Sequence, residues 1–208
     1  MPASITKQDF VRMLNGAVEQ IRTNEQYLGK LDAAIGDGDH GTTVRKVMDN
    51  LATAVAENAN NPLKDILFNG GMAAASTDGG SSAPLIGSLF MGMADPTEGK
   101  DSFTAADVAA IIASGIEAVK ADSKAQIGDK TMMDALLPVL ELLKQPAPAD
   151  VKALLVSVQD TARKGAEATK QFRAKFGRSR NLGDRVIGHE DAGANSIAFI
   201  FQGMCEAV

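Results

Sequence analysis

The sequence predicts an all-α protein, an antiparallel bundle or barrel of eight helices with its functional site in the loops at one end. Apolar residues recur at steps of three or four almost throughout the chain, which places them on single helix faces. No segment of useful length alternates apolar and polar residues, and no βαβ unit is evident. The 208 residues correspond to a single domain, 1–208.

Each of the first four predicted helices carries one apolar stripe. Thr6, with Asp9 three residues later, predicts the start of the first helix, and Pro62 predicts the first turn of the third. The stripes comprise Phe10, Val11, Leu14, Val18 and Ile21; Val44, Val47, Met48, Leu51 and Val55; Leu63, Ile66, Leu67 and Phe68; and, from about Pro84, Leu85, Leu89, Phe90 and Met93.

The remaining four predicted helices follow the same pattern. One starts near Thr104, with Asp107 three residues on, and another starts after Asp150. Gly165 lies on the apolar face of the seventh helix, where we expect close helix packing, and the prolines of 146–148 predict a turn. The stripes comprise Val108, Ile111, Ile112, Ile116 and Val119; Met132, Leu136, Leu137, Leu140 and Leu143; Val151, Leu154, Leu155, Val158, Ala162, Ala166 and Phe172; and Ile197, Phe199, Ile200 and Met204.

The composition disfavours several classes of protein. The single cysteine, Cys205, excludes an internal disulfide framework and a four-cysteine zinc site, fits a reducing compartment and is expected to pack in the core. The polar start MPASITKQDF is unlike a secretory signal, and the apolar stretch 83–94 is too short to span a membrane. Aromatic residues are 4% with no Trp, which disfavours a stacking platform for nucleic acid. We therefore expect a cytoplasmic protein with no membrane or nucleic-acid partner.

Charge is distributed unevenly along the chain. The net charge is −5, yet the segment 161–189 contains eight Lys and Arg residues against two acidic residues. Such a patch on an acidic protein favours a small anion or an acidic partner surface as its ligand. A solvated helix face is the alternative for 163–175.

Four connections are richer in glycine and polar residues than a turn requires, namely 35–43, 77–87, 124–134 and 177–196. Because binding residues concentrate on loops that a rigid scaffold positions, we expect the site there. In and beside the first loop, Asp32, Asp37 and Asp39 form a cluster of hard oxygen ligands, which suits Mg²⁺. The loop does not match the calcium-loop pattern. Helix capping and turn formation are the structural alternative for these aspartates.

Two further loops predict contacts with phosphate. Gly79–Ser82 precedes a helix, where glycines and free N–H groups suit an anion, although such a sequence is often only a turn. Arg178 and its neighbours Arg180 and Arg185 lie among glycines that would let the segment close over a ligand as a lid. His40 is a candidate at the metal–phosphate site, while His189 is a candidate base, ligand or simple hydrogen-bonding residue. Together these features predict Mg²⁺–nucleotide binding for phosphoryl transfer.

Four motifs resemble the nucleotide-binding L domain of dihydroxyacetone kinases. These are LDAAIGDGDHGTT, GGSSAPLIGS, GDKTMMDALLPV and GRSRNLGDRVIGHEDAGANS, in the family's order and spanning residues 31–196. The resemblance implies a barrel of eight antiparallel helices that binds ADP or ATP with two Mg²⁺ ions at one end. It implies Asp32, Asp37 and Asp39 as metal ligands and Arg178 as the lid arginine. It also implies nucleotide contacts at His40, Gly41, Thr42, Thr43, Gly79, Gly80, Ser81, Ser82, Met132, Asp191, Ala192 and Gly193.

The chain departs from the family's pattern at a few loop positions. The family usually has GGASGP where this chain has GGSSAP, Pro where Ala192 stands, Glu where Asp184 stands and Gly where Ser123 stands. These changes leave Mg²⁺–nucleotide binding intact but leave the partner and the sugar open.

The resemblance also implies partners. The chain is shorter than the family's substrate-binding K domain, so we expect a separate L subunit that works with a K subunit holding the ketose, as a dimer or hetero-oligomer. The favoured type retains ADP, which a phosphohistidine phosphotransferase protein recharges. The alternative exchanges ATP freely and acts on a related ketose such as erythrulose. A helical bundle that binds Mg²⁺ or Ca²⁺ passively and a subunit that binds a transcriptional regulator are further hypotheses.

Overall fold

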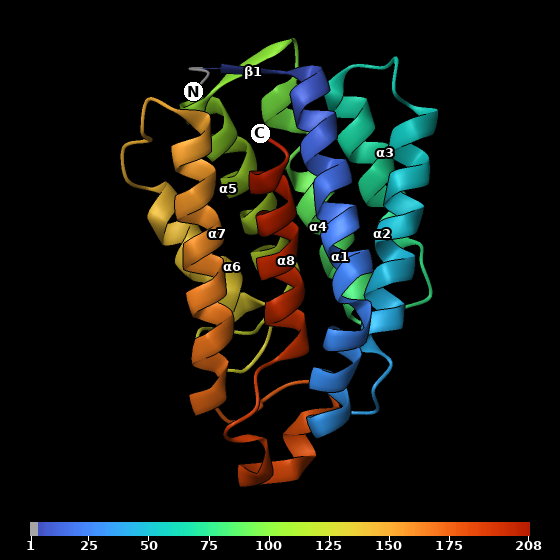
Figure 1. Cartoon of the computed structure of the whole chain (residues 1–208), viewed down its shortest axis with the longest axis vertical. Coiled ribbons are helices and arrows are strands. Elements are labelled where there is room, and N and C mark those ends of the chain that lie inside the picture. The colour runs from blue at the N-terminus through green and yellow to red at the C-terminus, as the bar shows by residue number, and fades with distance from the viewer. Residues whose placement is uncertain (1–3) are drawn as a thin grey trace.

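The computed structural model describes residues 4–208, so residues 1–3 of the expected domain lie outside the described part. Eight α-helices run up and down along the long axis of the molecule, as Figure 1 shows, and the predicted all-α class is confirmed. They are α1 (Lys7–Ile35), α2 (His40–Glu57), α3 (Leu63–Ala75), α4 (Ser82–Gly92), α5 (Ala105–Asp122), α6 (Met133–Leu143), α7 (Val151–Ala168) and α8 (Ala192–Glu206).

The helices form a closed ring. Each helix packs against the next along the chain, and α8 packs against α1 to complete the circle. The apolar faces meet inside this ring, where Phe10, Phe90 and Phe201 are fully buried. The amphipathic pattern therefore places one continuous core along the barrel, and the connections between helices lie at its two ends (Figure 1).

Two helix starts follow directly from local sequence. Thr6 caps α1 and Thr104 caps α5, each in a reciprocal capping box with an aspartate three residues later. A cap of this kind contributes about 1 kcal/mol. The two threonines also end the short strands β1 (Ser4–Thr6) and β2 (Ser102–Thr104), which pair antiparallel. The sequence did not predict these strands, because three residues are too few to display an alternating pattern.

Glycine allows the closing contact of the ring. A Cβ atom on Gly16 of α1 would lie 2.3 Å from the backbone oxygen of Gly203 in α8. The expected close packing at Gly165 is also present, since a Cβ atom there would lie 2.2 Å from the Asp134 backbone oxygen. Both sites bring backbone against backbone, which any larger residue would prevent.

Other boundaries differ slightly from the prediction. Helix α4 starts at Ser82, before Pro84, and α7 ends at Ala168, so Phe172 lies outside it. After α7 the chain forms two 3₁₀ segments, η2 (Thr169–Gln171) and η3 (Arg178–Val186), while η1 (Asp95–Thr97) lies between α4 and β2. Gly183 interrupts η3 with a positive φ of 58°. Cys205 is buried, as expected of a packing residue.

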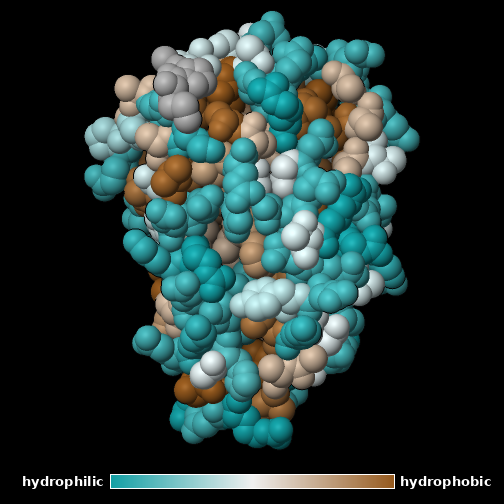
Figure 2. All heavy atoms as spheres, in the orientation of Figure 1, coloured by the Kyte–Doolittle hydropathy of each residue, from teal (hydrophilic) through white to brown (hydrophobic). Residues whose placement is uncertain are grey.

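The face of the molecule in Figure 2 is mostly hydrophilic, with separated groups of hydrophobic atoms. Among the described helices, none combines the length and the apolar character that crossing a membrane requires.

Candidate functional site

The glycine-rich connections meet at one end of the barrel, the lower end in Figure 1, around a cavity of about 1020 Å³. All four contribute to its wall. The lining comprises Asp32, Ile35, Asp37, Asp39, His40, Thr43, Asp78, Gly79, Gly80, Ser81, Ser82, Pro84, Leu85, Asp122, Ser123, Lys124, Ala125, Lys130, Thr131, Met132, Phe176, Gly177, Arg178, Ser179, Asp191, Ala192 and Gly193. The volume is that of a typical small-molecule site.

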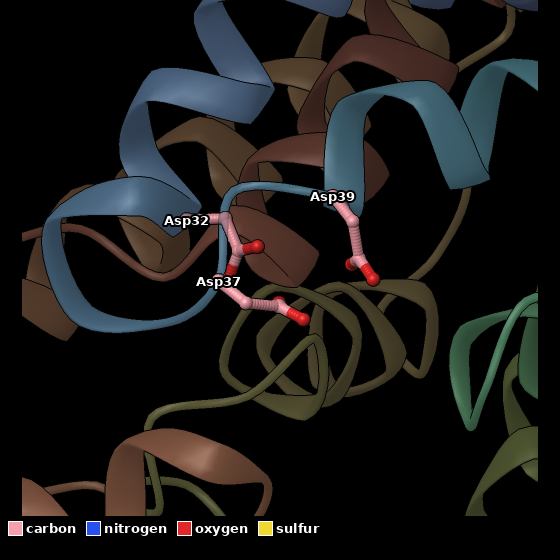
Figure 3. A group of neighbouring side chains, drawn as sticks. All are labelled: Asp32, Asp37 and Asp39. Carbon is pink, nitrogen blue, oxygen red and sulfur yellow. The ribbon is translucent and has the colours of Figure 1, made fainter.

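The three predicted metal ligands gather at this cavity. Carboxylate oxygens of Asp32, Asp37 and Asp39 lie within 4.8 Å of one another where the chain passes from α1 to α2 (Figure 3). Asp39 occupies the N-cap position of α2, but its side chain makes no capping hydrogen bond. Asp32 shapes the turn by accepting hydrogen bonds from the Gly38 N–H, at 2.8 Å, and the His40 N–H, at 3.3 Å. A group of oxygen ligands so close together suits a hard divalent cation such as Mg²⁺.

Arg178 brings the opposite charge to this cluster. Its guanidinium forms an ion pair with Asp37, although its side chain remains largely exposed. Arg178 begins η3, so the segment between α7 and α8 forms part of the cavity wall and contacts the acidic loop.

His40 is a neutral group in this environment. Burial lowers the pKa of His40, and the nearby Asp32 carboxylate offsets this effect only in part. Its Nε2 lies 2.8 Å from Ser196 Oγ of α8, which fixes the ring. His40 therefore offers a fixed, uncharged hydrogen-bonding group beside the aspartates.

The loop Gly79–Ser82 lines the cavity with all four of its residues. Gly80 has a positive φ of 57°, which only glycine adopts without strain. A Cβ atom on Gly79 would lie 2.9 Å from Thr43 Cγ2, so this loop packs closely on the start of α2. Because α4 begins at Ser82, its first turn supplies backbone N–H groups without intrahelical partners, the usual setting for a phosphate.

Met132 and the start of α8 form another wall. Met132 is the N-cap residue of α6 and is nearly buried, and a Cβ atom on Gly193 would lie 3.6 Å from its backbone nitrogen. Asp191 caps α8 by accepting a hydrogen bond from the Ala194 N–H at 2.7 Å. Burial raises the pKa of Asp191 from 3.8 to about 7. Ala192 completes this wall.

Two of the expected contact residues lie away from the cavity wall. Gly41 faces α1, where a Cβ atom would lie 2.1 Å from the Glu25 backbone oxygen, so its lack of a side chain serves helix packing. Thr42 Oγ1 donates to Glu25 Oε1 at 3.2 Å. The exposed residues His189, Arg180 and Arg185 are also absent from the wall, although they lie in the same segment as Arg178.

The basic segment 163–175 is only partly a solvated face. The Arg163 guanidinium donates to both carboxylate oxygens of Glu190, at 3.0 and 2.8 Å, and Lys170 Nζ lies 2.9 Å from the same carboxylate. Glu190 is buried. These cations therefore neutralise an internal carboxylate just before α8.

Sequence reasoning assigned no role to the charged side chains of 124–134. Asp129, Lys130 and Asp134 are all buried there, and Lys130 lines the cavity. Asp134 accepts hydrogen bonds from the N–H groups of Gly128, at 2.6 Å, and Thr131, at 2.7 Å, which shapes the loop. Phe176 also lines the cavity without having been singled out. The only signal for these residues was the unusual length and polarity of their loops.

Comparison with known proteins places the chain in a family. A family model described as the DAK2 domain matches residues 34–206. The chain is 33% identical over 201 residues to the "PEP-dependent dihydroxyacetone kinase, ADP-binding subunit DhaL" of Escherichia coli, with 96% of each chain covered. It is 33% identical over 204 residues to the "L-erythrulose 1-kinase" of Mycolicibacterium smegmatis, covering 96% of this chain and 35% of that protein.

A solved structure supports the same conclusion. The dihydroxyacetone kinase from C. freundii in complex with AMP-PNP and Mg²⁺ superposes with a TM-score of 0.71 at 27% identity, over 96% of this chain and 34% of that one. This chain thus spans about a third of that kinase. The match of the family model over most of the sequence, together with relatives aligned along almost the full length, shows that the chain belongs to the DAK2 domain family.

Proposed function

We propose that this protein is the nucleotide-binding subunit of a dihydroxyacetone kinase. The observation that carries the proposal is the convergence of Asp32, Asp37 and Asp39 at a cavity whose wall also contains the loop Gly79–Ser82. An acidic cluster for Mg²⁺ facing a phosphate-binding loop is the arrangement that Mg²⁺–nucleotide binding requires. The similar E. coli protein is named an ADP-binding subunit, which supports this interpretation.

Different residues would bind different parts of the Mg²⁺–nucleotide. Asp32, Asp37 and Asp39 would hold two Mg²⁺ ions, and Gly79–Ser82 with Thr43 and His40 would bind the phosphates of ADP or ATP. Met132 would contact the adenine, and Asp191, Ala192 and Gly193 would close the adjoining wall. Gly41 and Thr42 would contribute through α2 only indirectly, because they face α1.

Positive charge at the site would promote phosphoryl transfer. Mg²⁺ would neutralise the phosphate oxygens and orient them for transfer. Arg178, already placed beside Asp37, would add positive charge where the transferred group develops negative charge. His40 is neutral and fixed, so it would hold a phosphate oxygen or water rather than exchange a proton with it.

The acceptor would be a short ketose held by a separate K subunit. In the favoured type, ADP remains bound and a phosphohistidine phosphotransferase protein recharges it, in line with the name "PEP-dependent" of the E. coli relative. The alternative is free exchange of ATP and phosphorylation of a related ketose such as erythrulose, and the name "L-erythrulose 1-kinase" of the M. smegmatis relative supports the choice of ketose. We further propose a single domain, 1–208, that works in the cytoplasm as a dimer or hetero-oligomer. Binding of a transcriptional regulator is a secondary candidate role.

Native mass spectrometry of protein purified without added nucleotide tests the proposal. Retained ADP with two Mg²⁺ ions is the result expected of the phosphotransferase-dependent type. A protein that takes up ATP and ADP only on titration would assign it to the exchanging type. A protein that binds neither nucleotide when Mg²⁺ is supplied would overturn the kinase function and favour a passive helical bundle.

A further inference from the structure

The segment between α7 and α8 leaves the barrel and returns to it at one point. The Gly188 N–H donates to the Lys170 backbone oxygen at 2.8 Å, and the Asp191 N–H donates to Thr169 Oγ1 at 2.8 Å. These bonds close the base of a loop, residues 171–187, which we call the lid. The lid carries Phe176 and Arg178 to the cavity.

Lys130 joins both sides of that base to the loop between α5 and α6. Its Nζ donates to the Thr169 backbone oxygen at 2.6 Å and also to the His189 backbone oxygen. The side chain is buried, where an ammonium group is costly unless it is fully hydrogen-bonded. Lys130 also has a positive φ of 60°, which a residue with a side chain rarely adopts. The unfavourable backbone conformation of Lys130 therefore places its ammonium group between the two ends of the lid.

Asp129 holds the lid at a second point, through Lys175. The Lys175 N–H donates to the Asp129 backbone oxygen at 3.2 Å, and Lys175 Nζ lies 2.5 Å from Asp129 Oδ1. Asp129 is buried, and apart from the Lys175 ammonium its Oδ1 has no partner among the described residues, so this ion pair compensates for its burial. Burial raises the pKa of Asp129, but Lys175 and the Gln126 N–H outweigh this and keep the pKa below its ordinary value. The carboxylate is thus ionised and paired.

The two contacts differ in how easily they open. Lys130 is buried and makes both of its bonds to backbone, whereas the side chain of Lys175 is 66% exposed. Because water reaches the Lys175 ammonium, this ion pair opens more readily than the hydrogen bonds of the buried Lys130. The lid therefore has a fixed base at Lys130 and a releasable contact between Asp129 and Lys175, and Lys175 directly precedes Phe176 in the chain.

We propose that Asp129 and Lys130 are positioning residues that hold the lid over the nucleotide and so set the rate at which nucleotide leaves. This inference rests on the proposed nucleotide site and extends it. Neither residue needs to touch the reacting atoms. A strong Asp129–Lys175 contact would favour a resident nucleotide, and a weak one would favour free exchange.

Two substitutions break the releasable contact from opposite sides, Asp129→Asn and Lys175→Met. The first measurement is the dissociation rate of a fluorescent ADP analogue in the presence of Mg²⁺. We expect each variant to release it at least about fivefold faster, with no further increase in the double variant because both remove the same contact. Lys175→Arg keeps the charge and should restore the parent rate, and Lys164→Met, an exposed lysine on α7, is the matched control.

The second measurement needs no nucleotide. Cleavage by an arginine-specific protease at Arg178, Arg180 and Arg185 reports lid opening, and both variants should be cleaved several-fold faster than the Lys164→Met control. Unchanged cleavage and unchanged release would overturn the inference. A parent protein that binds no nucleotide would overturn the proposed function and the claim about release, while cleavage would still decide whether these residues hold the lid.

The role of Lys130 is tested on the unaltered protein, because its replacement leaves buried carbonyl groups without a donor and can prevent folding. Hydrogen exchange should be slow at the base amides of Gly188 and Asp191 and several-fold faster at the Lys175 amide. Base amides that exchange as fast as Lys175 would overturn the assignment of Lys130 as the fixed anchor.

Discussion

Arg178 forms an ion pair with Asp37, so the lid and the acidic loop are joined although they lie near opposite ends of the sequence. The same carboxylate belongs to the cluster proposed to bind Mg²⁺. A cation bound at Asp37 and the Arg178 guanidinium would therefore interact with the same carboxylate. Occupancy of the proposed metal site and the position of the lid would consequently be linked, and each would affect the other.

Replacing Asp37 tests the metal site. Asp37→Asn should weaken Mg²⁺-dependent ADP binding by at least about tenfold, or about 1.4 kcal/mol, because a charged oxygen ligand is lost. Isothermal titration with and without a chelator measures this. Asp65→Asn, an exposed aspartate at the start of α3, is the control, and helicity should not change in either variant. Unaltered ADP affinity in Asp37→Asn would refute the metal assignment.

Arg178 should matter more for turnover than for stability. Its exposed ion pair contributes at most about 1 kcal/mol to folding, whereas a cation aimed at developing charge is worth roughly 10²-fold in rate. We expect Arg178→Ala to reduce phosphoryl transfer by about that factor when the sugar-carrying partner is present. Arg185→Ala, from the same segment but away from the cavity wall, should stay near the parent rate. Equal turnover of Arg178→Ala and the parent would remove the arginine from the mechanism.

Asp191 predicts a pH dependence of the nucleotide-free protein. Burial raises the pKa of Asp191 from 3.8 to about 7, so the folded chain binds this proton more tightly than the unfolded chain. The resulting stabilisation is complete below pH 4 and is lost as the pH rises through about 7. Compared with Asp191→Asn, which keeps the helix cap, the parent should lose up to a few kcal/mol of unfolding free energy between pH 4 and pH 7. Urea titrations measure the unfolding free energy across this range, and the prediction would be contradicted if that of the parent and that of Asp191→Asn changed with pH in parallel.

The contact that closes the ring tolerates no side chain. Gly203→Ala would place a Cβ atom 2.2 Å from the Gly16 backbone oxygen and should cost about 1–3 kcal/mol, because two backbones must move apart. Gly29→Ala on α1 is the control, since its Cβ atom would meet its nearest neighbour at an ordinary 3.5 Å. This control should be neutral or slightly stabilising. Thermal unfolding distinguishes the two, and equal midpoints would show that the helices separate freely.

The sequence predicted whatever depends on residues close together in the chain. The capping boxes at Thr6 and Thr104 set two helix starts. Asp32, Asp37 and Asp39 could be proposed as metal ligands because they lie within eight residues of one another. Contacts between distant segments were not predictable. No pattern indicates that Lys130 reaches both Thr169 and His189, or that Gly41 is required for packing on α1.

The ring of helices also constrains the order in which the site is assembled. Helix α8 supplies Ser196, which holds His40, and its N-cap residue Asp191 lines the cavity, so the cavity lacks a wall until α8 docks on α1. During synthesis on the ribosome, α1 emerges first, and its neighbour α8 emerges only after the other six helices. Nascent chains of this protein should consequently acquire ligand affinity only after α8 has emerged, and a deletion that removes α8 should abolish the affinity of the remaining chain.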